Sequence, residues 1–121
     1  MIEYVEATLK DIEEMQLLVE PEVKSGVILP RSNDEIATNI RSYVLAKRGS
    51  ELLGFGALHF HTDKLGEIRS LIVSQSARGK SIGSHIVNEL LETARKLQAQ
   101  KVFSFICKSE NFLCLKLPCC L

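Results

Sequence analysis

The chain has 121 residues, of which 45% are hydrophobic and 25% charged, so it is long enough for one small domain with its own core. Its 15 lysines and arginines balance its 15 aspartates and glutamates. This neutral balance gives no whole-protein electrostatic support for nucleic-acid or membrane binding, and any anion site must therefore be local.

The N-terminal segment predicts a strand followed by a helix. Residues 2–7 alternate between apolar and polar side chains, as expected of a strand. Thr8 and Asp11 resemble a helix N-cap and its partner, and apolar residues follow them at helical spacing. Pro21 is expected to limit this helix, with a further short turn toward Lys24.

A second helix and a hairpin come next. Ser32 and Glu35 form a capping box, which predicts a helix that begins at Asn33. Strands are predicted over 43–47 and 51–61, and the tight turn between them makes the pair a hairpin. Two glycines within the second of these strands are expected to weaken or bend it.

The rest of the chain predicts a strand, a helix and another strand. The strand over 67–74 has a nearly continuous apolar run, which indicates a central position in a sheet. A polar loop over 75–80 leads to an amphipathic helix that starts at Ser81, and a β-rich run covers 101–107. The predicted order β-α-α-β-β-β-α-β describes an α/β domain with a mixed sheet flanked by helices.

The loop before the amphipathic helix predicts an anion site. A helix N-terminus leaves amides unpaired and carries partial positive charge, and glycines let the backbone approach a ligand. Gly79 and Gly83, with the charges of Arg78 and Lys80, favour a phosphate or pyrophosphate. An ordinary turn with solvated basic residues is the alternative. A nucleotide P-loop is disfavoured because the near match over 74–81 lacks the first glycine, and the G-x-G-x-x-G motif of dinucleotide folds is absent.

The segment over 71–87 resembles the central motif of the GNAT acetyltransferases, in which an apolar strand is followed by R-G-x-G-I-G and a helix. It departs from that motif at Ser81, where the family usually has glycine. The segments over 26–32 and 66–73 are similar to those of amino-acid acetyltransferases, nearest to the short bacterial N-acetylglutamate synthases. The resemblance covers residues 1–107 and implies a GNAT-like fold.

The resemblance also implies site residues and acetyl-CoA as cosubstrate. The backbone of Ile72 and Val73 corresponds to the strand that pairs with the pantetheine arm and the acetyl carbonyl. Glu67 matches the acidic residue that deprotonates the acceptor amine through water, with a solvated carboxylate as the alternative. The pyrophosphate would be held by Arg78, Gly79, Lys80, Ser81, Ile82, Gly83 and Ser84.

Two arginines are candidates for binding the carboxylates of an acceptor. Arg31 and Arg69 carry the planar donors that match a carboxylate, with ordinary surface positions as the alternative. Ser70, beside Arg69, is a further candidate for substrate binding. His59 and His61 lie at i and i+2, but no third ligand is evident, so we predict ordinary strand residues and no metal site.

These residues predict an N-acetyltransferase that acts on the α-amine of an amino acid, with L-glutamate in arginine biosynthesis as the favoured acceptor. Two alternatives stay open: acetylation of another amine or a protein N-terminus, and a non-catalytic, coenzyme A-binding domain. The N-terminus lacks a basic region followed by an apolar run, and no stretch approaches about 18 apolar residues. We therefore expect a cytoplasmic protein with a small-molecule amine substrate and no nucleic-acid or membrane partner.

The C-terminal residues depart from the family, whose members usually continue after the strand at 101–107 with a helix and two strands. Residues 108–121 are instead an apolar tail with three of the four cysteines. We therefore expect an incomplete domain over 1–107 and an unpaired edge on its last strand, which would favour a homodimer. Weak or absent turnover by the chain alone is also expected.

Overall fold

The computed structural model describes residues 1–26, 28–79, 81–106 and 111–116, and beyond residue 104 it describes the backbone alone. Six strands form one sheet in the order β1-β2-β3-β4-β5-β6, and all neighbours are antiparallel except the parallel pair β4–β5. The elements are β1 (Ile2–Glu6), α1 (Ile12–Lys24), α2 (Asn33–Thr38), β2 (Tyr43–Arg48), β3 (Glu51–Phe60), β4 (Leu65–Val73), α3 (Ile82–Lys96), β5 (Lys101–Ile106) and β6 (Asn111–Lys116). The predicted α/β class, mixed sheet and element order are confirmed.

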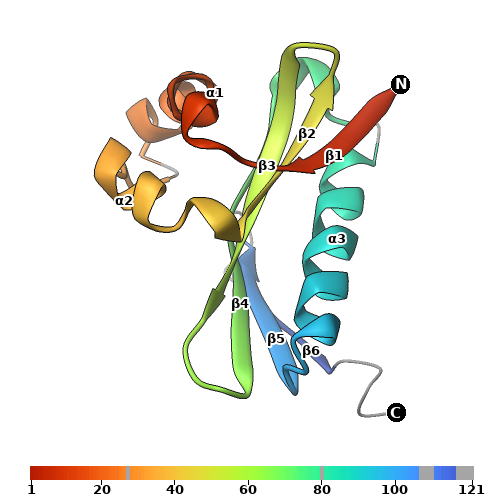
Figure 1. Cartoon of the computed structure of the whole chain (residues 1–121). Helices are drawn as coiled ribbons and strands as arrows, with labels where there is room; N and C mark the ends of the chain where they lie inside the picture. The colour runs from red at the N-terminus through yellow and green to blue at the C-terminus, as the bar shows by residue number, and fades with distance from the viewer. Residues whose placement is uncertain (27, 80, 107–110, 117–121) are drawn as a thin grey trace.

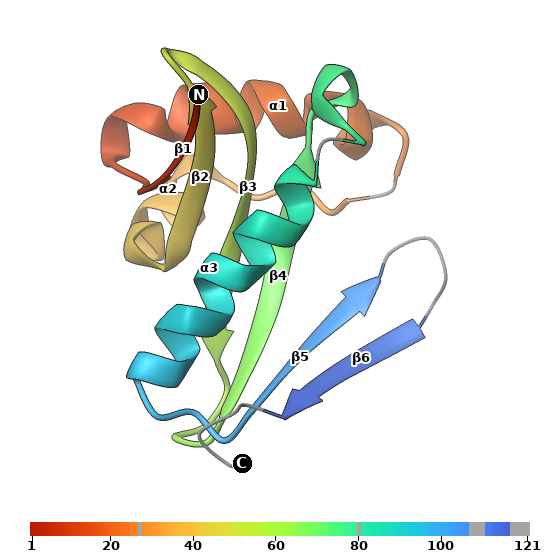
Figure 2. The ribbon, with the colours of Figure 1, turned by 90° about the vertical axis from the view of Figure 1, so that its right-hand side faces the viewer.

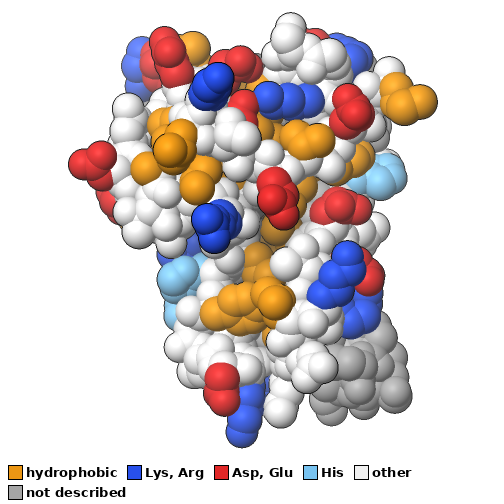
Figure 3. Space-filling view, viewed as in Figure 1, with side chains coloured by type: hydrophobic (Ala, Val, Ile, Leu, Met, Phe, Trp, Pro, Cys, Tyr) orange, Lys and Arg blue, Asp and Glu red, His pale blue; other side chains and the backbone are white. Residues whose placement is uncertain are grey.

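The helices cover the two faces of the sheet separately. Helices α1 and α2 lie on one face and α3 lies on the other (Figure 1). Alternation along β2 divides its side chains between two cores: Tyr43 and Leu45 pack toward α1 and α2, whereas Ala46 packs beneath α3. Acidic and basic side chains are intermixed on the surface seen in Figure 3.

Helix α3 follows the amphipathic pattern of its sequence. Its apolar stripe buries Ile82, Ile86, Leu90 and Ala94 against the sheet. The capping box before α2 is also confirmed, because the Glu35 amide donates to the Ser32 hydroxyl at 3.1 Å and the Ser32 amide donates to Glu35 at 3.0 Å. These two helix starts are where the local sequence signal is strongest.

Pro21 does not interrupt the first helix as predicted, although the expected extension toward Lys24 is confirmed. Helix α1 continues through it to Lys24. A proline within a helix removes one amide donor, but the carbonyl of Pro21 still accepts from the Ser25 amide at 3.1 Å. Pro21 is exposed near the C-terminal end of the helix, so one lost bond there is tolerated.

The expected unpaired edge on the last predicted strand is also wrong. Strand β6 pairs antiparallel with β5 over its full length, from Lys101 with Lys116 to Ile106 with Asn111. The edge proposed for a homodimer is therefore covered by the chain's own backbone. Strand β6 lies in the segment predicted to be a tail, where the apolar run over 112–115 has the composition of a strand.

Strand β4 carries a bulge in its pairing with β3, just beyond the point where its pairing with β5 ends. Phe55 pairs with Ile72 and Ala57 with Arg69, so Gly56 faces both Ser70 and Leu71. Ser70 adopts φ +57° at this point. Pairing between β4 and β5 extends only from Leu65–Lys101 to Ile68–Ser104, and beyond it the two strands diverge (Figure 2). The remainder of β4 therefore has backbone groups that β5 does not pair.

Candidate functional site

A surface hollow of about 330 Å³ lies at the N-terminus of α3, where the sequence predicted an anion site. A short 3-10 helix, Gln75–Ala77, turns the chain from the end of β4 into this loop. Of the residues predicted to hold pyrophosphate, all those that the structure describes line the hollow: Arg78, Gly79, Ser81, Ile82, Gly83 and Ser84. Lys80 lies outside the described residues.

Two left-handed residues shape the loop. Gly79 has φ +86°, and a Cβ placed on it would have no neighbour within 4 Å, so its backbone is open to a ligand. Ser81 is the N-cap of α3 and has φ +63°. A glycine adopts this conformation without strain, whereas a serine has a cost of order 1 kcal/mol. This conformation gives a physical reason for glycine at this place in the GNAT motif.

The amides of the first turn of α3 complete the anion site. The first intrahelical bond from the cap runs from the His85 amide to the Ser81 carbonyl at 3.1 Å. Three amides come before this bond in the chain, those of Ile82, Gly83 and Ser84. They have no carbonyl acceptor within the helix. With the positive end of the helix dipole, they fit a pyrophosphate such as that of coenzyme A.

Arg78 has a second role that the sequence did not predict. Its guanidinium contacts Glu22 of α1 at 3.0 Å and donates to the Val73 carbonyl at 3.2 Å. These contacts tie α1 to the end of β4 beside the hollow. Arg78 therefore both adds positive charge to the rim and holds the loop against α1.

An Arg78→Ala variant is expected to bind acetyl-CoA at least about tenfold more weakly, because hydrogen bonds to charged groups contribute about 1.5–3 kcal/mol. Its affinity should also depend less on salt. Calorimetry over a salt series measures both effects. Glu22→Ala is the matched control, since it removes the contact between Arg78 and α1 and keeps the cation. If both variants lost affinity equally, Arg78 would act through α1 and not on the pyrophosphate.

Glu67 lies on the sheet face that α1 and α2 cover, next to its cross-strand partners His59 on β3 and Phe103 on β5. Its Oε1 accepts from Arg69 at 3.1 Å and lies 2.7 Å from Nε2 of His61. Burial alone would raise the pKa of the Glu67 carboxyl, but the hydrogen bonds and charges of His61 and Arg69 hold it below its ordinary value. The carboxylate is therefore ionised at neutral pH.

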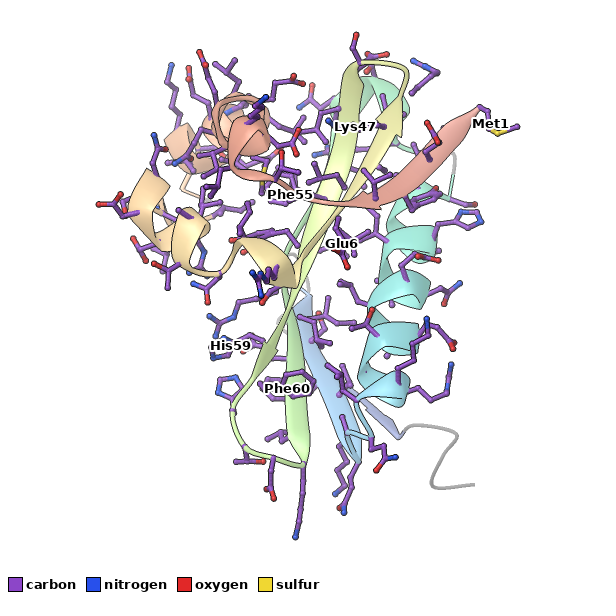
Figure 4. All side chains as sticks on the ribbon, in the orientation of Figure 1. Met1, Glu6, Lys47, Phe55, His59 and Phe60 are labelled. Atoms are coloured by element: carbon purple, nitrogen blue, oxygen red, sulfur yellow. The ribbon has the colours of Figure 1, made fainter. Side chains whose placement is uncertain are left out.

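The candidate acceptor residues meet in two narrow pockets that share Arg31 and Tyr43. One pocket is largely apolar and includes Ser70 among its lining residues, and the other includes Arg69 and His59. The structure thus brings together the three residues predicted to bind substrate, although they come from a loop and from β4. Figure 4 shows His59 and Phe55 projecting from β3 on the side of α1 and α2.

His59 belongs to this cluster, whereas the sequence indicated an ordinary strand residue. Burial lowers its pKa, and electrostatic interactions with Arg69, His61 and Arg31 lower it further against the opposing effect of Glu67. The ring is therefore uncharged at neutral pH and adds no cation to the pocket. In the β3–β4 hairpin His59 pairs with Glu67. This register is the signal that could have identified His59 as a neighbour of the site.

Among the described residues, no group of three or more histidine, cysteine, aspartate or glutamate residues is placed to hold a metal ion. None of the helices described has the length and apolarity that crossing a membrane requires.

The α/β fold and the loop at α3 are those expected of a domain that binds a pyrophosphate-containing cosubstrate. The model of the acetyltransferase (GNAT) family matches residues 8–117, and the chain belongs to this family. The match crosses the boundary predicted at residue 107 and includes β6.

Comparisons with individual proteins agree with this assignment. The chain is 31% identical to an uncharacterised N-acetyltransferase of Chlorobaculum tepidum, over 88% of this chain and 68% of the relative. It is 44% identical to an amino-acid acetyltransferase of Mycobacterium tuberculosis, over 51% of this chain and 36% of the relative. A structure of N-acetylglutamate synthase from Neisseria gonorrhoeae, complexed with coenzyme A and N-acetyl-glutamate, matches with a TM-score of 0.81 and 25% identity, over 86% of this chain and 25% of that one. The chain thus spans about a third of the Mycobacterium relative and a quarter of the Neisseria protein.

Proposed function

We propose that the chain acetylates the α-amine of an amino acid, with L-glutamate as the preferred acceptor and acetyl-CoA as the donor. The observation that carries this proposal is the cluster of Arg31, Arg69 and Glu67 on one face of the sheet. Arg31 and Arg69 line one pocket, and Arg69 also contacts Glu67 at 3.1 Å. Two guanidinium groups beside a carboxylate base suit an acceptor that has both carboxylates and an amine.

Each part of the site has a distinct role in this reaction. Acetyl-CoA supplies an activated thioester, and the loop at α3 would hold its pyrophosphate. Glu67 accepts a proton from the acceptor ammonium through water, which leaves a nucleophilic amine. The backbone of Ile72 and Val73, in the part of β4 that diverges from β5, would bind the acetyl carbonyl and stabilise its developing negative charge. The amine would attack the thioester carbonyl directly; as the amide forms, the thioester C–S bond breaks and coenzyme A leaves as the thiol with the proton that the amine releases, so no covalent enzyme intermediate is needed.

The Neisseria synthase and the Mycobacterium amino-acid acetyltransferase support the choice of acceptor by their names. We further propose that the reaction belongs to arginine biosynthesis and takes place in the cytoplasm. A small-molecule amine is then the partner of the site.

Acetyl-CoA binding followed by an acceptor screen tests the proposal. We expect calorimetry to show binding of acetyl-CoA, and thiol-release assays to show transfer to L-glutamate. L-Norvaline, which keeps the chain length and lacks the side-chain carboxylate, should have a kcat/KM at least about tenfold lower, because it leaves a guanidinium unpaired.

Other outcomes would contradict the proposal. Equal kcat/KM for L-glutamate and L-norvaline would exclude a pocket for the second carboxylate. Faster transfer to a peptide N-terminus would identify a protein acceptor. Binding of acetyl-CoA without thiol release for any acceptor would identify a non-catalytic coenzyme A-binding domain.

A further inference from the structure

The ring of His61 is held by side chains from three strands. Its Nε2 lies 2.7 Å from Oε1 of Glu67 on β4. The ring stacks on Phe103 of β5 with centroids 5.6 Å apart, and it meets His59 of β3 edge to face at 4.8 Å. Although the side chain is 37% exposed, its orientation is therefore set by the sheet beneath it.

The turn between β3 and β4 also fixes the backbone of His61. Its amide donates to the Leu65 carbonyl at 2.9 Å, which closes the turn. Within the turn, the hydroxyl of Thr62 accepts from the amides of Lys64 and Leu65 at 3.1 and 3.0 Å. Because the turn is closed in this way, the ring of His61 reaches back over Glu67.

The two partners of Glu67 both contact the same oxygen. His61 and Arg69 both engage Oε1, and in the described part of the chain no hydrogen bond reaches Oε2. Two donors that approach from different segments fix the position of Oε1. Its second oxygen keeps its full capacity to accept a proton.

The titratable and charged side chains around Glu67 come from four segments. His61 approaches from the turn, Arg69 lies on the same strand, His59 is the cross-strand neighbour on β3, and Arg31 lies in the loop before α2. Burial raises the pKa of Glu67, and the hydrogen bonds and charges of His61 and Arg69 together lower it below its ordinary value. Loss of either donor should therefore raise this pKa toward the ordinary glutamate value.

We propose that His61 is a positioning residue for acetyl transfer: with Arg69 it holds Oε1 of Glu67, so that Oε2 is left to take the acceptor's proton through water. This inference rests on the proposed function. His61 acts through Glu67 and does not itself contact the reacting atoms.

A pair of variants tests the role of His61 in turnover. His61→Ala removes the donor to Glu67, and we expect kcat/KM to fall by about tenfold to a hundredfold because the base loses its orientation. His61→Gln can place an amide donor near the position of Nε2, and we expect it to recover most of the loss. Acetyl-CoA affinity and thermal stability, measured on both variants, show that each one is folded.

A second readout needs no turnover. The Glu67 carboxyl can be titrated by carbon-13 NMR without acetyl-CoA or acceptor. In His61→Ala we expect the pKa of Glu67 to rise toward its ordinary value, and in His61→Gln to stay low, because the amide still donates to the carboxylate.

The two readouts separate the possible failures. Equal kcat/KM in wild type and His61→Ala would overturn this inference alone, and so would a Glu67 titration that does not move in that variant. No acetyl transfer by the wild-type chain to any acceptor would overturn the proposed function and the catalytic role of His61 together. A loss of kcat/KM that His61→Gln does not recover would show that the imidazole acts through something other than this hydrogen bond.

Discussion

Glu67→Gln is expected to lower kcat/KM for acetyl transfer by about 10²- to 10⁴-fold, the usual contribution of a positioned general base. The substitution preserves shape, and the amide oxygen can still accept from His61 and Arg69 as Oε1 does. What it removes is the capacity to take a proton. Thiol release with L-glutamate measures the loss, and acetyl-CoA affinity should be unchanged because Glu67 does not line the hollow at α3.

The pH dependence follows from the direction of the Glu67 shift. Because its pKa in the folded chain lies below the ordinary value of 4.5, the base is ionised throughout the neutral range. The rise of kcat/KM with pH near and above neutrality should therefore come from the acceptor ammonium. The lowered pKa also makes the free energy of unfolding depend on pH. The stabilising contribution of ionised Glu67 is present above its unfolded pKa and is lost as the pH falls through its folded pKa.

Two results would contradict this role. Unchanged turnover in Glu67→Gln would remove the residue as base. A fall in acetyl-CoA affinity comparable with the fall in kcat/KM would instead indicate a structural effect on the site. A melting curve at the assay pH distinguishes loss of fold from loss of chemistry.

Local signals in the sequence predicted those parts of the fold that local interactions determine. The apolar stripe of α3 and the capping box at Ser32 depend on residues within one helical turn of each other, and both were confirmed. The loop before α3 was also predicted, because glycine and basic residues at a helix start have a direct physical meaning. Pro21 was misjudged because a proline near the end of a helix removes only one bond.

The parts that were missed depend on pairing between distant segments. Strand β6 is specified by its partner β5, and its composition alone did not distinguish a strand from an apolar tail. The bulge at Ser70 appears only when the register of β3 with β4 is known. The contact between Arg78 and Glu22 joins residues 56 positions apart, and no sequence spacing indicates it.

The candidate site likewise combines residues that the sequence predicted with contacts that depend on pairing between distant segments. Glu67, Arg31 and Arg69 were predicted as separate candidates, and the sheet and the loop before α2 bring them together. His61 and Phe103 were not predicted as site residues, because their stacking requires the parallel register of β4 with β5. Residue type thus indicated the chemistry of the site, and strand register determined which side chains surround it.

Gly54→Ala is the substitution for which we expect the largest loss of stability. A Cβ at Gly54 would lie 2.6 Å from the Ile72 carbonyl oxygen, 3.2 Å from the Val73 Cα and 3.4 Å from the Ile86 side chain. The first two are backbone atoms of β4, so the strands must move apart. Overpacking of this kind lowers the free energy of unfolding by about 1–3 kcal/mol.

The same displacement should weaken acetyl-CoA binding, because Ile72 and Val73 belong to the part of β4 proposed to hold the pantetheine arm and the acetyl carbonyl. Urea unfolding measures the stability, and calorimetry measures the affinity. Gly83→Ala is the stability control: its Cβ would meet only the Val73 side chain, at 3.6 Å, and within a helix it should be neutral or stabilise by about 0.5–1 kcal/mol. If Gly54→Ala were as stable as Gly83→Ala, close approach of β3 to β4 would not be the reason for a glycine at this position. If it were unstable yet bound acetyl-CoA with wild-type affinity, the backbone of Ile72 and Val73 would not form part of the cosubstrate site.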